Sequence, residues 1–185
     1  MAEMQKTLVN GIDVEQLKRN IGELRQDPTL AQFKLRTRNH WQGAGHNESV
    51  ISGFYGIGKE QTHSEAFHVR CDEPKALVGE DTQASPVEYL LHALAGCVTN
   101  SISYHAAVQG IAIESMDSTL EGDMDMQGFL GLSPTAERGY QRIRVTMEIK
   151  SDASAEQLKE LAEFSPVYST LKKSVPVDLE IKKVG

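Results

Sequence analysis

Residues 85–109 constrain the fold most, because they combine a strong helix-start signal with an apolar surface on nearly every side. Ser85 suits the N-cap, Pro86 suits the first helical position, and Glu88 completes a capping box with Ser85. Gly110 supplies the left-handed residue that commonly ends a helix. An apolar surface almost all round is typical of a helix buried on most sides. The sequence therefore predicts a long, buried central helix.

The segments on either side of this helix predict a mixed helix and strand fold. Residues 13–26 carry apolar side chains at helical spacing, so residues 1–30 are expected to form a helical appendage to a main domain over 31–185. Alternating apolar residues and many glycines between 33 and 71 indicate an antiparallel meander. The elements expected after the central helix are strands over 111–122 and 143–149, helices over 154–164 and 165–173, and a final strand over 177–181. The order (α)βββαββααβ places the chain among α+β folds.

Charge and cysteine content narrow the partners and the compartment. The chain has 185 residues, a formal net charge of −7 and two cysteines. This charge disfavours nucleic acid and membrane partners, because both require a concentrated positive surface. The sequence has neither a long apolar run nor the pattern of a signal peptide. We therefore expect a cytoplasmic protein whose two thiols stand reduced.

Two sequence patterns suggest a phosphate-binding loop and a metal site, but neither has the residues that such a site requires. Residues 53–59 have the glycines and the lysine of a phosphate-binding loop, but Glu60 stands where that loop has serine or threonine. A glycine-rich hairpin is expected there instead. Histidines and cysteines do not occur at metal-ligand spacings, since His68 and Cys71 fall on opposite faces of a predicted strand. The sequence predicts no metal and no bound cofactor.

Cys97 and Cys71 are the remaining candidates for chemistry. Cys97 lies eleven residues into the predicted helix beside Gly96, which leaves room for a molecule to approach its sulfur. An apolar helix interior favours the thiol over the thiolate, so a reactive Cys97 requires a cation from another segment. Cys71 precedes Asp72 and Glu73, whose charges disfavour its thiolate. Alternatively, either cysteine serves as a small buried hydrophobic residue.

Two segments resemble motifs of the OsmC/Ohr superfamily, the osmotically induced and organic hydroperoxide resistance proteins. They are SPVEYLLHALAGC at 85–97 and FSPVYS at 164–169, and the resemblance extends over residues 30–184. It implies an OsmC-like α+β fold, with mixed or antiparallel sheets around the long central helix. It also implies an intertwined homodimer with a site at each subunit boundary. In the peroxidase members, the cysteine that Cys97 matches attacks an organic hydroperoxide and becomes a sulfenic acid.

The resolving cysteine of the family is missing from the second motif. Ser165 stands at its position, and a hydroxyl cannot form a disulfide with the cysteine at 97. Cys71 is an alternative resolving thiol only if the fold brings its Cα within about 7 Å of that of Cys97. Reduction of the oxidised Cys97 back to the thiol is therefore expected to use an external thiol.

The groups that activate the cysteine in the family are also displaced. In the peroxidases an acidic residue directly follows the proline, and here that position is occupied by Val87. Glu88 comes one residue later and is either the shifted catalytic acid or only a capping residue. The turn after the first strand contains no arginine. Arg36 and Arg38 are the nearest candidates for a guanidinium that favours the thiolate of Cys97.

These observations leave alternative functional hypotheses. The first is a thiol-dependent reductase of organic hydroperoxides that oxidises Cys97 and is regenerated by an external thiol. The second is a non-catalytic dimer that holds a small hydrophobic ligand in a subunit-interface pocket, with Cys97 as part of its wall. A third is a purely structural dimer without a pocket. An arginine that reaches Cys97 would favour the first hypothesis.

Overall fold

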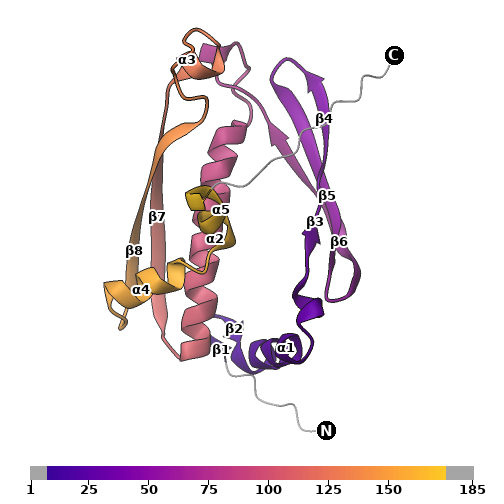
Figure 1. The fold of residues 1–185 in the computed structure, drawn as a ribbon, viewed down its shortest axis with the longest axis vertical. Helices are drawn as coiled ribbons and strands as arrows, with labels where there is room; N and C mark the ends of the chain where they lie inside the picture. Colours follow the sequence, from indigo (N-terminus) through magenta and orange to yellow (C-terminus); the bar gives the residue numbers. More distant parts are fainter. Residues whose placement is uncertain (1–7, 174–185) are drawn as a thin grey trace. The chain divides into compact units, whose positions relative to one another are not determined.

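The computed structural model describes residues 8–173, which form α-helices and antiparallel strands (Figure 1). The described residues fall into two compact units, an N-terminal unit that ends at His92 and a C-terminal unit that begins at Ala93. The domain boundary predicted near residue 30 stays a prediction, and the predicted final strand over 177–181 lies outside the described residues. No helix within residues 8–173 is long and apolar enough to cross a membrane.

The N-terminal unit begins with a small hairpin and one amphipathic helix. Strands β1 (Leu8–Val9) and β2 (Ile12–Asp13) pair around Asn10 and Gly11, which have φ angles of 52° and 77°. Asn-Gly is a strong sequence signal for such a turn, and this hairpin was not among the predicted elements. Helix α1 (Val14–Gln26) follows, with the Asp13 carboxylate accepting from the Gln16 amide at 2.9 Å. The predicted N-terminal helix is thus confirmed.

An antiparallel sheet follows the 3₁₀ turn at Pro28–Ala31. Its strands are β3 (Lys34–Leu35), β4 (Arg38–Gly43), β5 (His46–Gly56) and β6 (Lys59–Cys71), and β5 pairs with the other three. The predicted meander is confirmed, although its first strand is divided into β3 and β4. A bulge in β5 between Ile51 and Gly53 shifts the pairing. A Cβ on Gly53 would lie 2.4 Å from the Gln61 carbonyl oxygen, so this position requires glycine.

The predicted glycine-rich hairpin is also confirmed. The turn between β5 and β6 places Ile57 and Gly58 at φ angles of 51° and 71°. Positive φ at both central residues is the geometry that suits a two-residue hairpin. The lysine at 59 therefore begins a strand and not a helix, which removes the structural context of a phosphate-binding loop.

Asp72 organises the loop between β6 and the long helix. Its side chain is 0% exposed and accepts from the Glu73 amide at 2.7 Å. The Thr82 amide and hydroxyl donate to its other oxygen at 3.0 and 3.1 Å. These hydrogen bonds, first of all that from the Thr82 backbone, hold the pKa of Asp72 below its ordinary value. The carboxylate thus fixes both ends of the loop that leads to Ser85.

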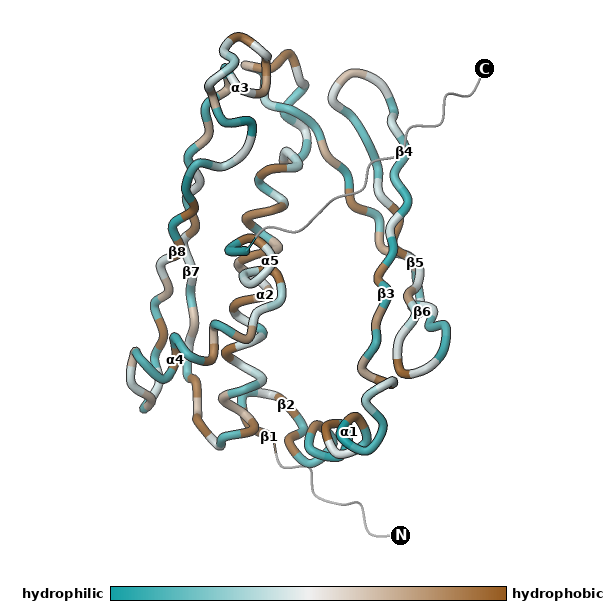
Figure 2. The backbone as a smooth tube through the Cα atoms, in the orientation of Figure 1, coloured by the Kyte–Doolittle hydropathy of each residue, from teal (hydrophilic) through white to brown (hydrophobic). Residues whose placement is uncertain are grey.

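Helix α2 (Pro86–Gln109) confirms the predicted central helix, and Gly110 ends it at a φ of 74°. Hydrophobic residues recur along its length (Figure 2). Four of its buried residues, Leu94, Val98, Ile102 and Ala106, recur every four residues and form one buried stripe, and Ala107 is buried beside the end of that stripe. Other apolar side chains remain open, with Leu90 37% and Tyr104 50% exposed. A single chain therefore buries a smaller part of the α2 surface than the all-round apolar pattern predicts.

The C-terminal unit packs two long strands and two short helices on this buried stripe. Strands β7 (Ile113–Met124) and β8 (Tyr140–Ser151) form an antiparallel hairpin beside α2 (Figure 1). The short helix α3 (Met126–Phe129) lies in their connection. Helices α4 (Ala155–Ala162) and α5 (Pro166–Lys173) follow, and Ser154 and Gln157 form the predicted capping box. The core includes Leu94, Val98, Ile102, Ala106, Leu158 and Leu161.

Replacing Ile102 with alanine is expected to destabilise the protein strongly. The side chain is 1% exposed and belongs to this core, so its truncation removes apolar contacts and leaves a cavity. We expect a loss of about 2–5 kcal/mol in the free energy of unfolding, measured by urea denaturation. Asn100→Ala, at an exposed position of the same helix, should change it by less than about 0.5 kcal/mol. Equal effects of the two substitutions would contradict this packing.

Candidate functional site

Cys97 lies on α2 at the edge of the buried stripe and is half-buried. Successive helical residues turn by about 100°, so its side chain is displaced by that angle from Val98, which belongs to the stripe. Outside the backbone of its own helix, a Cβ on Gly96 would meet no heavy atom within 4 Å in the described part of the chain. The predicted room beside the cysteine is therefore present. Cys97 is a free thiol that is neither fully sealed in the core nor fully exposed.

Glu88 caps the start of α2. Its carboxylate accepts from the Ser85 amide at 2.7 Å and from the Ser85 hydroxyl at 2.6 Å. The hydroxyl hydrogen bond, followed by the amide one, lowers the pKa of Glu88. Nine residues separate Glu88 from Cys97, which corresponds to about 180° around a regular helix and about 13 Å along it. The capping interpretation of Glu88 is confirmed, and its carboxylate is not brought to the cysteine of the same chain.

The two candidate arginines differ in what they bind. The Arg36 guanidinium donates to both carboxylate oxygens of Glu60 at 2.6 and 2.9 Å, which raises the pKa of Arg36 and lowers that of Glu60. Arg38 begins β4 at an exposed position opposite Val50 of β5. Within residues 8–173, no ion pair or side-chain hydrogen bond engages Arg38. Both arginines belong to the N-terminal unit, whereas Cys97 belongs to the C-terminal unit.

Ser165 is fully buried and begins α5. Its hydroxyl accepts from the Tyr168 amide at 3.2 Å, and its carbonyl oxygen accepts from the Ser169 amide at 2.9 Å. These are the contacts of an N-cap residue, and Pro166 occupies the first helical position. The residue at the position of the second-motif cysteine therefore has a structural role in this chain.

Cys71 ends β6 in the N-terminal unit, opposite Asn47 of β5. Burial of the half-buried side chain, and then the negative charge of Glu73, raise the pKa of the Cys71 thiol. The predicted disfavouring of its thiolate is confirmed for Glu73. The Asp72 carboxylate is instead taken up by the hydrogen bonds of the following loop.

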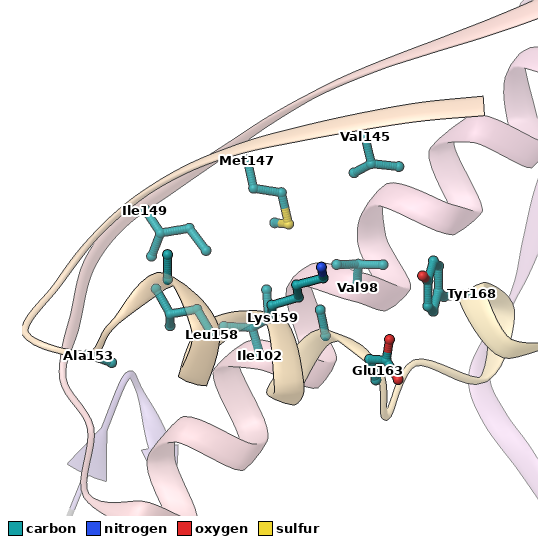
Figure 3. A pocket seen from close by; sticks show the side chains of 12 residues that line it. Val98, Ile102, Val145, Met147, Ile149, Ala153, Leu158, Lys159, Glu163 and Tyr168 are labelled. Atoms are coloured by element: carbon teal, nitrogen blue, oxygen red, sulfur yellow. The ribbon is translucent and has the colours of Figure 1, made fainter. Parts of the chain in front are cut away.

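A pocket of about 450 Å³ opens within the C-terminal unit between α2, β8, α4 and α5 (Figure 3). Apolar side chains form most of its wall, among them Val98, Ile102, Met147, Ile149 and Leu158. Polar groups come from Lys159, Glu163 and Tyr168. Cys97 is not among the described residues that line it. The sequence analysis missed this pocket because no pattern within one segment marks a space left between four elements.

Metal ligands do not gather in the described part of the chain. Within residues 8–173, no three histidine, cysteine, aspartate or glutamate side chains are arranged to hold a metal ion. His46 lies 3.8 Å from Asp72 and 3.5 Å from Glu80, measured between ring nitrogens and carboxylate oxygens. This contact joins the first turn of the sheet to the loop before α2.

Comparison with protein families gives one match. The sequence model of the family described as OsmC-like protein matches residues 79–180, which include α2, Cys97 and Ser165. No curated protein matches the sequence.

Solved structures resemble the fold at low sequence identity. An OsmC-like protein from Mycoplasma pneumoniae is 20% identical with a TM-score of 0.57, over 76% of this chain and 89% of that one. A Psychrobacter arcticus protein named for osmotic stress and a detoxification response is 14% identical with a TM-score of 0.54, over 72% and 85%. An OsmC-like protein of unknown function from Vibrio cholerae is 11% identical with a TM-score of 0.50, over 77% and 93%. These likenesses confirm the predicted α+β fold.

Glu88→Ala is expected to weaken the start of α2 without changing the reactivity of Cys97. Loss of the capping contacts should cost about 0.5–2 kcal/mol of unfolding free energy at neutral pH. Because the folded-state pKa of Glu88 is lowered, this contribution is present above the ordinary pKa and disappears as the pH falls through the lowered one. Urea denaturation at pH 7 and at about pH 3 measures the difference.

The matched control is Glu23→Ala, which removes an exposed carboxylate from α1. It should change the unfolding free energy by less than about 0.5 kcal/mol. A slower alkylation of Cys97 by iodoacetamide in folded Glu88→Ala protein, with stability unchanged, would refute the capping assignment.

Proposed function

This chain belongs to the OsmC-like protein family, and from that membership we propose that it is a thiol-dependent reductase of organic hydroperoxides. Cys97 is the peroxidatic cysteine of this proposal. The observation that carries it is the position of this thiol, which lies within the matched residues, is half-buried on α2 and adjoins open space at Gly96. A partly enclosed thiol with an approach route suits attack on a small apolar peroxide.

The proposed reaction has two stages. The Cys97 thiolate attacks the terminal oxygen of the hydroperoxide, so that an S–O bond forms, the O–O bond breaks, and the alkoxide takes a proton and leaves as an alcohol. Cys97 is then a sulfenic acid. One external thiol condenses with it to give a mixed disulfide and water, and a second external thiol releases Cys97 as an external disulfide forms. The hydroperoxide is reduced by two electrons, which both come from the external thiols.

Arg38 is the proposed source of the cation that favours the thiolate. Its guanidinium has no ion-pair partner among residues 8–173, whereas that of Arg36 is held by Glu60 through two hydrogen bonds. A guanidinium committed to a carboxylate offers less charge to a third group. This difference supports Arg38 over Arg36 and leaves Glu88 to helix capping.

An external thiol is the proposed reductant because neither internal candidate suits the step. The Ser165 hydroxyl cannot form a disulfide and already caps α5. The pKa of Cys71 is raised by burial and by Glu73, which lowers the thiolate fraction that could attack a sulfenic acid. A reductant supplied from outside the chain is consistent with a cytoplasmic protein, where small thiols and dithiols are abundant.

A homodimer is part of the proposal. Helix α2 leaves the apolar side chains of Leu90 and Tyr104 37% and 50% exposed, and Gly96 is exposed beside Cys97. Apolar helix surface of this kind favours coverage by a second copy. Such coverage would enclose Cys97 and exclude water from the reacting sulfur.

Cys97→Ser is expected to abolish consumption of tert-butyl hydroperoxide in the presence of dithiothreitol. Cys71→Ser is the matched control, because it removes the other thiol of the chain and should retain most of the activity. The measurement is the loss of peroxide with time at equal protein concentration. Unchanged consumption by Cys97→Ser would overturn the proposed function.

Ser165→Cys is expected to install an internal resolving thiol in the Cys71→Ser background. One equivalent of tert-butyl hydroperoxide should then produce a disulfide between positions 97 and 165, visible by mass spectrometry as the loss of two hydrogen atoms. Loss of the Ser165 cap should also cost about 1 kcal/mol of stability. If the sulfur at 97 is oxidised but no disulfide forms in the folded variant, the second motif of this chain has no resolving geometry.

A second candidate function is ligand binding, at a place other than the subunit-interface pocket with Cys97 in its wall that was expected from the sequence. The C-terminal unit contains a largely apolar pocket that Cys97 does not line. Its size lies in the range of about 300–1,000 Å³ that is typical of small-molecule sites. A protein with this pocket can hold a small hydrophobic ligand whether or not its thiol reacts.

A further inference from the structure

We propose that the pocket of the C-terminal unit binds an amphiphilic monocarboxylate, with its apolar chain among the core side chains and its carboxylate at Lys159. The inference deepens the second candidate function, ligand binding within the C-terminal unit, and rests on it. It does not depend on the reactivity of Cys97, which is not among the lining residues.

The wall of the pocket explains the apolar part of the ligand. Val98 and Ile102 come from the buried stripe of α2, Met147 and Ile149 from β8, and Leu158 from α4. Their side chains point into one space in Figure 3. Burial of an unbranched alkyl chain against these groups removes apolar surface from water on both sides.

The charged residues at the pocket are the reason for proposing a carboxylate as the head group of the ligand. Glu163 is already paired, because the Lys172 amine lies 3.4 Å from its carboxylate and 5.3 Å from the centre of the Tyr168 ring. Lys159 also lines the pocket, and no ion pair engages it among residues 8–173. Because Glu163 pairs with Lys172, it does not hold the amine of Lys159, which stays without an ion pair in this part of the chain.

The direction of Lys159 supports the same assignment. Figure 3 shows its side chain extending from α4 toward Val98, so that the amine lies beside the apolar wall. Glu156 and Glu160 share an adjoining cavity with Lys159 but do not line this pocket. A single ammonium group beside an apolar wall matches a ligand with one negative charge at the end of an alkyl chain.

A group with two negative charges fits less well. Lys159 is the one cation among the described residues that line the pocket, so the second charge of a phosphate monoester would have no cation to pair with and would share the pocket with the Glu163 carboxylate. A neutral alcohol of the same length would gain the apolar contacts but not the ionic one. The charge of the head group therefore provides the discriminating test.

The experiment is calorimetric titration of the full chain with decanoate and, separately, with 1-decanol. The wild-type protein should bind decanoate more tightly than 1-decanol. Lys159→Met keeps an unbranched apolar side chain and removes the charge, so it should weaken decanoate binding about 3- to 10-fold and leave 1-decanol binding unchanged. Lys150 on β8 pairs with Glu114 on β7 and does not line the pocket, so Lys150→Met should leave both affinities unchanged.

The outcomes separate this inference from the proposed reductase. Cys97→Ser should bind decanoate as the wild type does, and its peroxide consumption is measured in the same preparations. Failure of the wild type to bind decanoate, equal affinity for decanoate and 1-decanol, or unchanged decanoate affinity in folded Lys159→Met would overturn the inference. None of these results affects the test of Cys97, and an unreactive Cys97 does not affect decanoate binding.

Discussion

The packing of one stripe of α2 against β8 and α4 determines the arrangement of the C-terminal unit. Leu94, Val98, Ile102 and Ala106 recur every four residues, so they form one continuous side of the helix and bury it against their neighbours. Cys97 directly precedes Val98 and is therefore placed at the edge of that contact, half-buried and still approachable. The pocket lies where Val98 and Ile102 meet β8 and α4 without filling the space between them.

Helices α2 and α5 both begin with the same Ser-Pro pair, in which the serine caps the helix. Ser-Pro begins α2 at 85–86 and α5 at 165–166, and in both places the serine hydroxyl accepts an amide hydrogen bond. At the first start, Glu88 completes the cap. At the second, Ser165 takes the position that the family motif gives to a cysteine. The hydroxyl of Ser165 is thus used as a helix cap and offers no thiol at this place.

The features that the sequence predicted well are those encoded within one segment. The bounds of α2 follow from Ser85, Pro86 and Gly110, and the hairpin at 53–59 follows from its glycines. The ion pairs, in contrast, depend on strand register. Arg36 and not Arg38 pairs with Glu60 because of the position of Glu60 on β6, which no local pattern specifies. The pocket likewise requires four elements to assemble. Asn10-Gly11 is the exception, because its hairpin signal was present and was not used.

The central claim is that Cys97 is a peroxidatic thiol, and the most direct measurement is its oxidation by one equivalent of tert-butyl hydroperoxide. The experiment uses a Cys71→Ala variant at neutral pH, with mass spectrometry following the addition of one oxygen atom at Cys97. The account predicts that this sulfenic acid forms faster than on free cysteine under the same conditions, because a peroxidatic site holds its sulfur as the thiolate. Oxidation of Cys97 no faster than that of free cysteine would contradict it.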